Sequence, residues 1–482
     1  MGKQSLKEKT AKGLFWGGLS NGVQQLLGLV FGIFLARILN ADDYGMVGML
    51  TLFSLIASTI QESGFTAALA NKKAISHEDY NAVFWCSVLV SLSLYIILFF
   101  CAPLIAGFYD TPELTTLARY SFLGFFISAS GIAHHAYLFR NLMVKQKAIT
   151  MMISLTLSGI VGITLALLGM SYWGIATQNL VYIISVSSCY WFFSPWRPTF
   201  QLNFKPLKGM LGFSSKLLVS NICVHVNHNL FSVLLGKFYS EKEVGYFTQA
   251  NKWNSMGHSL ITGMLQGVTQ PVLTQVEDSD RQRHIFRKML RFTAFVSFPA
   301  MFGLSLIARE LIRITITDKW LPAVDMMQLL CIGGAFSSIV RLYSDLMVSK
   351  GKSGIYMWIT IGNCLVQLPA MLFLYPYGVQ NMITAYVIIN ICWLFVWHYY
   401  LQREIKLPLL TALKDILPFV GIASFVIIVT YFITANIENL YLLIIGKIII
   451  AGILYIAILW ICRATTLKES IAFLFKRKPD VY

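Results

Sequence analysis

Long runs of apolar residues recur along the whole chain, and only short polar segments separate them. A run of about 18 or more such residues is long enough to cross the hydrocarbon core of a bilayer as an α-helix. The helix is required because lipid offers no hydrogen-bond partners to the backbone. The pattern predicts fourteen membrane-spanning helices, at residues 13–39, 44–70, 80–108, 114–139, 148–169, 172–194, 208–236, 244–275, 290–314, 322–348, 354–375, 380–400, 410–434 and 440–462.

The composition favours a membrane protein over a soluble one. Of the 482 residues, 56% are hydrophobic and only 12% are charged, whereas a soluble domain carries about 25% charged residues. The net charge of +16 is also typical of nucleic-acid-binding proteins. Because membrane proteins collect Lys and Arg in their cytoplasmic loops, we instead predict an all-α integral membrane protein without a nucleic-acid partner.

The distribution of Lys and Arg among the loops predicts the orientation. With the N-terminus inside the cell, the inner segments hold 27 basic residues and the outer loops hold 6, whereas ten acidic residues fall on each side. The inner loop richest in Lys and Arg is expected from Glu277 to Arg291. Because Lys and Arg favour the cytoplasmic side, both termini are expected in the cytoplasm.

A weak internal repeat relates the two halves of the chain at an offset of 200 residues. It predicts two parallel six-helix lobes, residues 1–200 and 201–405, followed by two appended helices and a tail within 406–482. Lobes of six spans have the same orientation, so a central cavity is expected between them. Between positions 20–45 and 220–245, five of 26 aligned residues are identical: Ser20 and Ser220, Asn21 and Asn221, Phe31 and Phe231, Leu35 and Leu235, and Gly45 and Gly245.

Charged residues well inside the predicted spans have a positive balance. Each such charge costs at least about 2.5 kcal/mol unless it meets water, a partner or a ligand. The excess of cations therefore favours an anionic ligand, and phosphate is the obvious candidate. The charges are Arg119, Lys216, Lys252, Arg341, Lys447, Glu62 and Asp345.

Some of these charges have an explanation that needs no ligand. Arg341 and Asp345 are four residues apart on one helix, which is the spacing of an ion pair. They also remain candidates, Arg341 for substrate binding and Asp345 for ion coupling. Arg119 is a further substrate candidate, but both Arg119 and Lys447 are expected to extend their charged groups to the membrane surface.

The other three charges point to the cavity. Lys216 and Lys252 lie on the spans 208–236 and 244–275, which are expected to line it, and we predict that both bind substrate. Glu62 lies near the inner half of the second span. It either pairs with a lysine or serves as a proton or cation site.

Uncharged polar residues form stripes on three spans. On the span 208–236, Asn221, His225 and Asn229 follow one helical face. Single Ser or Thr residues usually join helices, but large amides and a histidine on one face favour a cavity lining that hydrogen-bonds sugar hydroxyls. Corresponding polar residues on the first and eighth spans are Asn21, Gln25, Asn251 and Ser255.

The sequence contains no motif for catalysis, metal binding or nucleotide binding. Gly351, Lys352 and Ser353 match the end of a P-loop, but Leu346 stands where that motif requires glycine. The eight cysteines form no C-x-x-C pair. We therefore expect a transporter without a cofactor, and not an enzyme, driven by ion gradients, membrane potential or the substrate gradient.

Four segments of the chain resemble one family. The segment ARILNADDYG at 36–45 is similar to the A-R-x-L-x-x-x-D-[YF]-G signature of polysaccharide biosynthesis flippases. QESGFTAAL at 61–69, LFRNLMVKQKA at 138–148 and LKGMLGFSSKLLVSN at 207–221 also resemble it. On these segments the chain is identified as a member of the Wzx-type oligosaccharide flippases, within the multidrug/oligosaccharidyl-lipid/polysaccharide exporter superfamily.

The resemblance implies a substrate and a location. Such flippases move undecaprenyl-diphosphate-linked oligosaccharide units from the cytoplasmic to the periplasmic leaflet of the bacterial inner membrane, for O-antigen, capsule or exopolysaccharide synthesis. Alternating access of two lobes is implied as well, together with contacts to membrane lipids, a polysaccharide polymerase and a chain-length regulator. The resemblance assigns no site residues, because the cavity residues vary within the family.

Two other functions remain as alternatives. An ion-coupled multidrug antiporter of the same superfamily would need buried carboxylates for organic cations, whereas only Glu62 and Asp345 stand against five bases. A membrane glycosyltransferase or polymerase would need a large loop with catalytic residues. The longest outer stretch, 313–321, is too short for that role.

Overall fold

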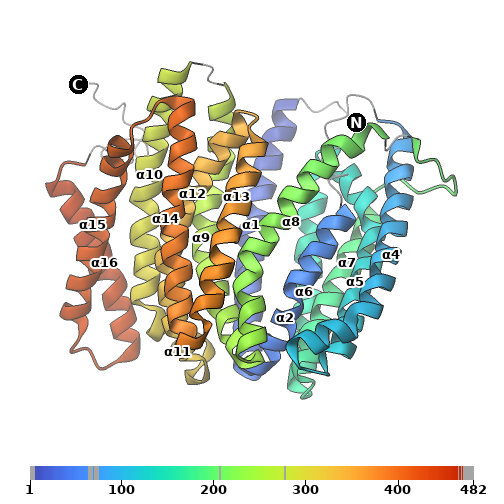
Figure 1. Ribbon diagram of the computed structural model, residues 1–482, viewed down its shortest axis with the longest axis horizontal. Helices are drawn as coiled ribbons and strands as arrows, with labels where there is room; N and C mark the ends of the chain where they lie inside the picture. The colour runs from blue at the N-terminus through green and yellow to red at the C-terminus, as the bar shows by residue number, and fades with distance from the viewer. Residues whose placement is uncertain are drawn as a thin grey trace. The chain divides into compact units, whose positions relative to one another are not determined.

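The structure is a computed structural model made of α-helices and short connections (Figure 1). It describes residues 6–62, 69, 75–205, 208–275, 278–464, 466, 467 and 469. Side chains are described throughout these ranges except at 6–15, 17, 19, 62, 208–217, 219, 220, 264–275, 279 and 353. Two compact units, residues 1–245 and 246–482, divide the chain.

The first unit is a bundle of long helices. Within it, α4 packs on α5, α5 on α7, α6 on both α7 and α1, and α2 on α8. The helices are α1 (Leu6–Ile38), α2 (Ala41–Glu62), α4 (His77–Tyr109), α5 (Leu114–Arg140), α6 (Val144–Leu167), α7 (Ser171–Phe193) and α8 (Lys208–Phe238).

The second unit is also helical. Its first helix, α9 (Glu241–Gln275), begins at the end of the first unit. Within the second unit, α10 packs on α12 and α15, α12 on α14, and α15 on α16, drawn in red in Figure 1. The remaining elements are α10 (Ser279–Leu306), α11 (Ala308–Ile316), the 3-10 turn η2 (Asp318–Trp320), α12 (Ala323–Ser349), α13 (Ser353–Leu374), the 3-10 turn η3 (Tyr375–Tyr377), α14 (Val379–Ile405), α15 (Leu409–Thr434) and α16 (Leu440–Ile461).

The hydrophobic pattern predicted these helices well. Most predicted spans coincide with one long helix each, and most ends agree within a few residues, whereas the span 290–314 falls on two helices, α10 and α11, which are separated at Ile307. In the described part of the chain, 11 helices are long and apolar enough to cross a membrane, which is compatible with fourteen spans. The expected all-α membrane fold is therefore confirmed, while the lobe boundaries at 200 and 405 stay predictions.

The exterior of both units is apolar, as a lipid environment requires. Large hydrophobic side chains are exposed along the helices, for example Phe100 at 72% and Ile461 at 78%. In water such a surface would drive aggregation. Within a bilayer it faces acyl chains, and the backbone polar groups remain satisfied inside the helices.

The predicted inner loop from 277 to 291 is wrong in one respect, because most of it is helical. Asp278 caps α10, since its carboxylate accepts the Arg281 backbone N–H at 3.0 Å. Farther along, Arg287 forms two hydrogen bonds to Asp415 of α15, at 2.7 and 3.0 Å. A capped helix with its own ion pair thus extends beyond the apolar run, which hydropathy alone does not reveal.

The segment between α7 and α8 is fastened to α4 by a small set of hydrogen bonds. Buried Asn81 accepts the Thr199 backbone N–H at 2.9 Å and donates to the Gln201 carbonyl at 2.7 Å. Trp85 donates its indole N–H to the Thr199 carbonyl at 2.7 Å. Because these bonds pair backbone groups outside any helix, they hold this extended segment against the first unit.

A buried ion pair joins α16 to α11 in the second unit. The Lys447 ammonium lies 2.8 Å from a Glu310 carboxylate oxygen and donates to the Leu306 carbonyl at 3.2 Å. Both charged side chains are only 7% exposed. The Lys447 ammonium is therefore buried in an ion pair instead of extending outward, which corrects the expectation from sequence.

We expect Lys447→Ala to lower the stability of the purified protein by about 3–5 kcal/mol, because the substitution leaves the Glu310 carboxylate buried without its cation. Thermal unfolding in detergent measures the effect as a lower midpoint. Arg313→Ala is the matched control, since it breaks an exposed pair with Asp318 and should cost at most about 1 kcal/mol. Equal shifts for both variants would contradict a stabilising role for the buried pair.

Candidate functional site

Lys252 is the candidate cation for which the described residues provide no partner. It lies on α9 with a half-buried side chain. Among the residues that the structure describes, no ion pair or hydrogen bond satisfies its ammonium group. Since a half-buried ammonium without a hydrogen-bonding partner is costly, contact of Lys252 with water or an anionic ligand is favoured. On the same helix, Asn251 is half-buried and Ser255 is exposed.

Arg341 and Asp345 form the ion pair that their spacing predicted. The Arg341 Nε and the Asp345 Oδ1 are 3.1 Å apart on α12. Their environments differ, because the Arg341 side chain is 47% exposed and that of Asp345 only 10%. The pair neutralises the carboxylate, yet much of the guanidinium stays accessible and has donors left for a ligand.

Arg119 is anchored on the neighbouring helix. Its Nε donates to the Phe99 carbonyl at 3.2 Å, and its guanidinium carbon lies 4.3 Å from the centre of the Phe99 ring. Both interactions join α5 to α4 inside the first unit. They offer Arg119 a structural role through a hydrogen bond and a cation–π contact.

Two candidates fall outside the described side chains. They are Lys216 on α8 and Glu62 at the end of α2. Their assignments therefore stay predictions, Lys216 as a substrate ligand and Glu62 as a coupling site.

The predicted polar stripes are accessible on α1 and α8 of the first unit. Asn21 and Gln25 are exposed on α1. On α8, Asn221 is exposed and His225 is half-buried, while Asn229 donates its amide to the His225 carbonyl at 2.9 Å. Asn229 therefore uses part of its hydrogen-bonding capacity within its own helix, and Asn221 offers more of its amide to a ligand.

A group of buried amides between α13 and α14 was not predicted. Asn363 and Gln367 both donate to the Asn390 side-chain oxygen, at 3.1 and 3.0 Å. Gln367 is fully buried and Asn363 is 8% exposed. The spacing of Asn363 and Gln367, one helical turn apart, was the available signal. These contacts join two helices in the membrane, as interhelical amides commonly do.

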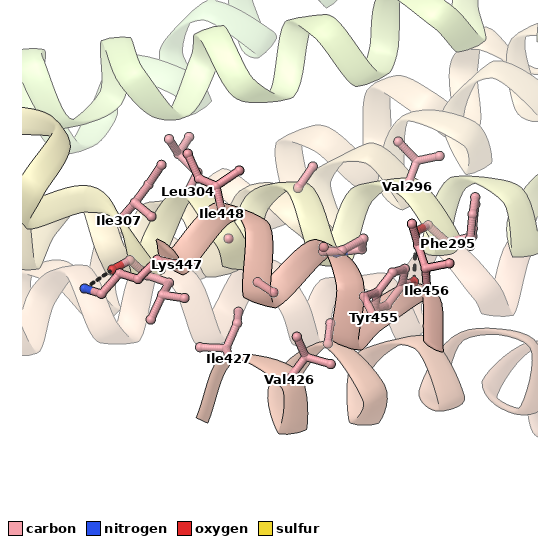
Figure 2. Close-up of a pocket in the computed structure, with 17 residues that line it drawn as sticks. Phe295, Val296, Leu304, Ile307, Val426, Ile427, Lys447, Ile448, Tyr455 and Ile456 are labelled. Carbon is pink, nitrogen blue, oxygen red and sulfur yellow. Dashed lines mark hydrogen bonds between the residues drawn. The ribbon is translucent and has the colours of Figure 1, made fainter. Parts of the chain in front are cut away.

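The second unit also contains an apolar cavity, which does not belong to the polar site. Its volume is about 530 Å³, and it lies between α10, α15 and α16. Figure 2 shows Val426, Ile448 and Ile456 along its walls, with Lys447 at one end and Tyr455 at the other. The Tyr455 hydroxyl donates to the Phe295 carbonyl at 2.9 Å. The walls offer little to a charged or hydroxylated ligand.

The polar site is therefore suited to binding and solvation. Lys252, Arg341 and the neighbouring Asn251 and Ser255 of the second unit supply donors suited to phosphate and sugar oxygens, and their assembly into one site stays a prediction. Within the described ranges, no group of three His, Cys, Asp or Glu side chains is placed to hold a metal ion.

Comparison with known proteins identifies the class. Residues 34–325 match the polysaccharide biosynthesis protein family, and the chain belongs to this family. The lipopolysaccharide biosynthesis protein WzxC of Escherichia coli (strain K12) is 23% identical over 375 residues, which cover 76% of this chain and 75% of that protein. The resemblance noted in the four sequence segments is thereby confirmed.

Solved structures share the fold. Lipid II flippase MurJ, in its inward closed conformation, is similar with a TM-score of 0.74 at 17% identity, covering 92% of this chain and 97% of that one. An inward-facing multidrug resistance MATE family transporter of the MOP superfamily gives 0.64 at 18% identity, covering 80% and 94%. At these identities the likeness concerns the fold.

We expect water to reach Lys252 and Arg341, because Lys252 has no partner in the described part of the chain and Arg341 is half exposed. In a parent without native cysteines, Lys252→Cys and Arg341→Cys should react with a membrane-impermeant maleimide. Buried positions on the same helices provide controls: Ala250→Cys on α9 and Ser338→Cys on α12, both 0% exposed in the present structure, should react at least about tenfold more slowly. Similar rates at all four positions would contradict a wet polar site.

Proposed function

We propose that the chain is a flippase for lipid-linked oligosaccharides, a transporter and not an enzyme. It carries undecaprenyl-diphosphate-linked repeat units from the cytoplasmic to the periplasmic leaflet for surface polysaccharide synthesis. The observation that carries the proposal is the half-buried Lys252, to which the described residues offer no partner, on a polar helix of a membrane protein in the polysaccharide biosynthesis family. An uncompensated cation at membrane depth is explained by an anionic cargo.

The chemistry of the cargo matches the two kinds of side chain at the site. A diphosphate is an anion that Lys252, Lys216 and the accessible guanidinium of Arg341 bind through charge-assisted hydrogen bonds. Sugar hydroxyls both donate and accept, as do the amides of Asn21, Gln25, Asn221 and Asn251. The lipid tail remains in the bilayer, so only the head group needs a polar route.

The membrane potential supplies part of the driving force in the proposed orientation. With both termini in the cytoplasm, the anionic head group leaves the negative side of the membrane. Each elementary charge moved across 100 mV is worth about 2.3 kcal/mol. A coupled ion at Glu62 or Asp345 would alter this sum. A polysaccharide polymerase and a chain-length regulator are the proposed partners that use the delivered units.

We expect Lys252→Ala to reduce flipping of a labelled undecaprenyl-diphosphate oligosaccharide at least about tenfold, because the variant loses a charge-assisted contact worth roughly 1.5–3 kcal/mol. Purified protein in proteoliposomes is the assay, and loss of label from the accessible leaflet is the readout. Lys414→Ala is the matched control, because this exposed lysine lies at the start of α15 and away from the stripe.

The outcomes distinguish the function from the site. If Lys252→Ala left flipping unchanged, the flippase function would stand, and the assignment of Lys252 to the substrate site would be wrong. If the protein flipped no oligosaccharide and exported cationic dyes, the multidrug antiporter function would be supported and the flippase function refuted.

A further inference from the structure

The segment between α7 and α8, residues 194–205, is fastened to one face of α4. His77, Asn81 and Trp85 follow one another at a spacing of four residues, so they share that face. All three contact Thr199 of the segment. The His77 Nε2 lies 3.3 Å from the Thr199 hydroxyl oxygen, while Asn81 and Trp85 bind the Thr199 backbone. Figure 1 shows the segment, here called the connecting segment, as the green loop beside the start of α4.

One side of the connecting segment carries a row of exposed apolar residues. Phe200 is 93% exposed, Leu202 64% and Phe204 40%. They alternate with residues whose backbone is bound by α4, because the Thr199 N–H and the Gln201 carbonyl both pair with that helix. Successive side chains of an extended chain point to opposite sides, so the three apolar side chains lie on a common side. Exposure of this row to water would be unfavourable.

The row continues the lipid-facing surface of α4. The ring centres of Phe200 and Trp85 are 5.5 Å apart. Beyond Trp85, exposed apolar side chains follow at spacings of three or four residues, which places them on one helical face. They are Leu89, Leu92, Ile96 and Phe100. Because such a stripe on a membrane-spanning helix faces acyl chains, the row beside the start of the stripe is directed toward the same lipid.

The length of α4 places the connecting segment at the membrane surface. The helix has 33 residues and is about 50 Å long at 1.5 Å per residue, whereas the hydrocarbon core is about 30 Å thick. About 10 Å of a centred helix therefore lies beyond the core at each end, and the stretch from His77 to Trp85 spans about 12 Å. Trp85 then lies at the boundary, where indole rings are enriched. Water in the head-group layer can also satisfy the non-helical backbone of the segment, which hydrocarbon cannot.

We propose that the connecting segment is an anchor in the membrane interface, where Phe200, Leu202 and Phe204 insert between phospholipid head groups. The interface is the one at which α4 begins, which is the cytoplasmic side in the proposed orientation. Exposed Arg197 and Lys205 lie on either side of the apolar row, and they contact the lipid phosphates there. The inference goes beyond the proposed function, because the anchor serves the protein whatever its cargo.

Spin-label accessibility tests the anchor. In a parent without native cysteines, a nitroxide is attached at Phe200→Cys or Leu202→Cys, and the protein is placed in nanodiscs of phosphatidylethanolamine and phosphatidylglycerol. Collisions with O₂, which concentrates in lipid, are compared with collisions with a water-soluble nickel chelate. At both positions the ratio of O₂ to nickel collisions should be several-fold higher than at Glu78→Cys, the control at an exposed acidic position in the first turn of α4. Phe100→Cys, within the lipid-facing stripe, should give the highest ratio.

Two results would overturn the anchor. A ratio at Phe200→Cys and Leu202→Cys equal to that at Glu78→Cys would show that the apolar row lies in water. Low collision rates with both reagents would show that protein covers the row, either a second copy of the chain or another partner. The measurement requires no flipping, so its outcome and that of the flipping assay are independent.

Discussion

Burying a charge in the hydrocarbon layer costs several kcal/mol unless the charge meets a partner or water. This cost explains why most charged side chains inside both units are paired. Lys447 is satisfied by Glu310 and a backbone carbonyl, and Arg119 by a carbonyl and an aromatic ring. Arg341 is balanced by Asp345. Of the intramembrane charges whose side chains are described, Lys252 has no such compensation. Among the described side chains, this is the charge most available to a ligand.

The same cost explains why the exterior and the polar site differ so sharply. Helices that satisfy their own backbone can expose Phe100 and Ile461 to lipid. Asn21, Gln25 and Asn221 are exposed on helices of the same bundle, and they gain nothing from acyl chains. Their accessibility is favourable only where water or a hydroxylated head group reaches them. A lipid with a large polar head group needs both surfaces, because its tail requires an apolar surrounding and its head group requires polar side chains or water.

The helices could be predicted from the sequence because hydropathy and the backbone hydrogen bonds of a helix depend only on residues that are close together in the chain. Prediction failed where a helix continues on polar residues, as α10 does through Arg287. It also failed for Lys447, because the carboxylate that buries it lies 137 residues away. The pairing of Arg341 with Asp345 was predictable because both residues lie on one helix. Partners on different helices are set by tertiary packing, and neither periodicity nor charge counting contains that information.

The internal repeat explains why the contact between the starts of α2 and α9 has a glycine on each side. Two copies of one turn that face each other make every contact twice, so a residue that is small in one copy has to be small in the other. Gly45 and Gly245 satisfy this condition, and each would otherwise strike the opposite backbone. Sequence identity at an offset of 200 residues was too sparse to single out this pair among five. The geometry does so, because this backbone contact tolerates no Cβ on either side.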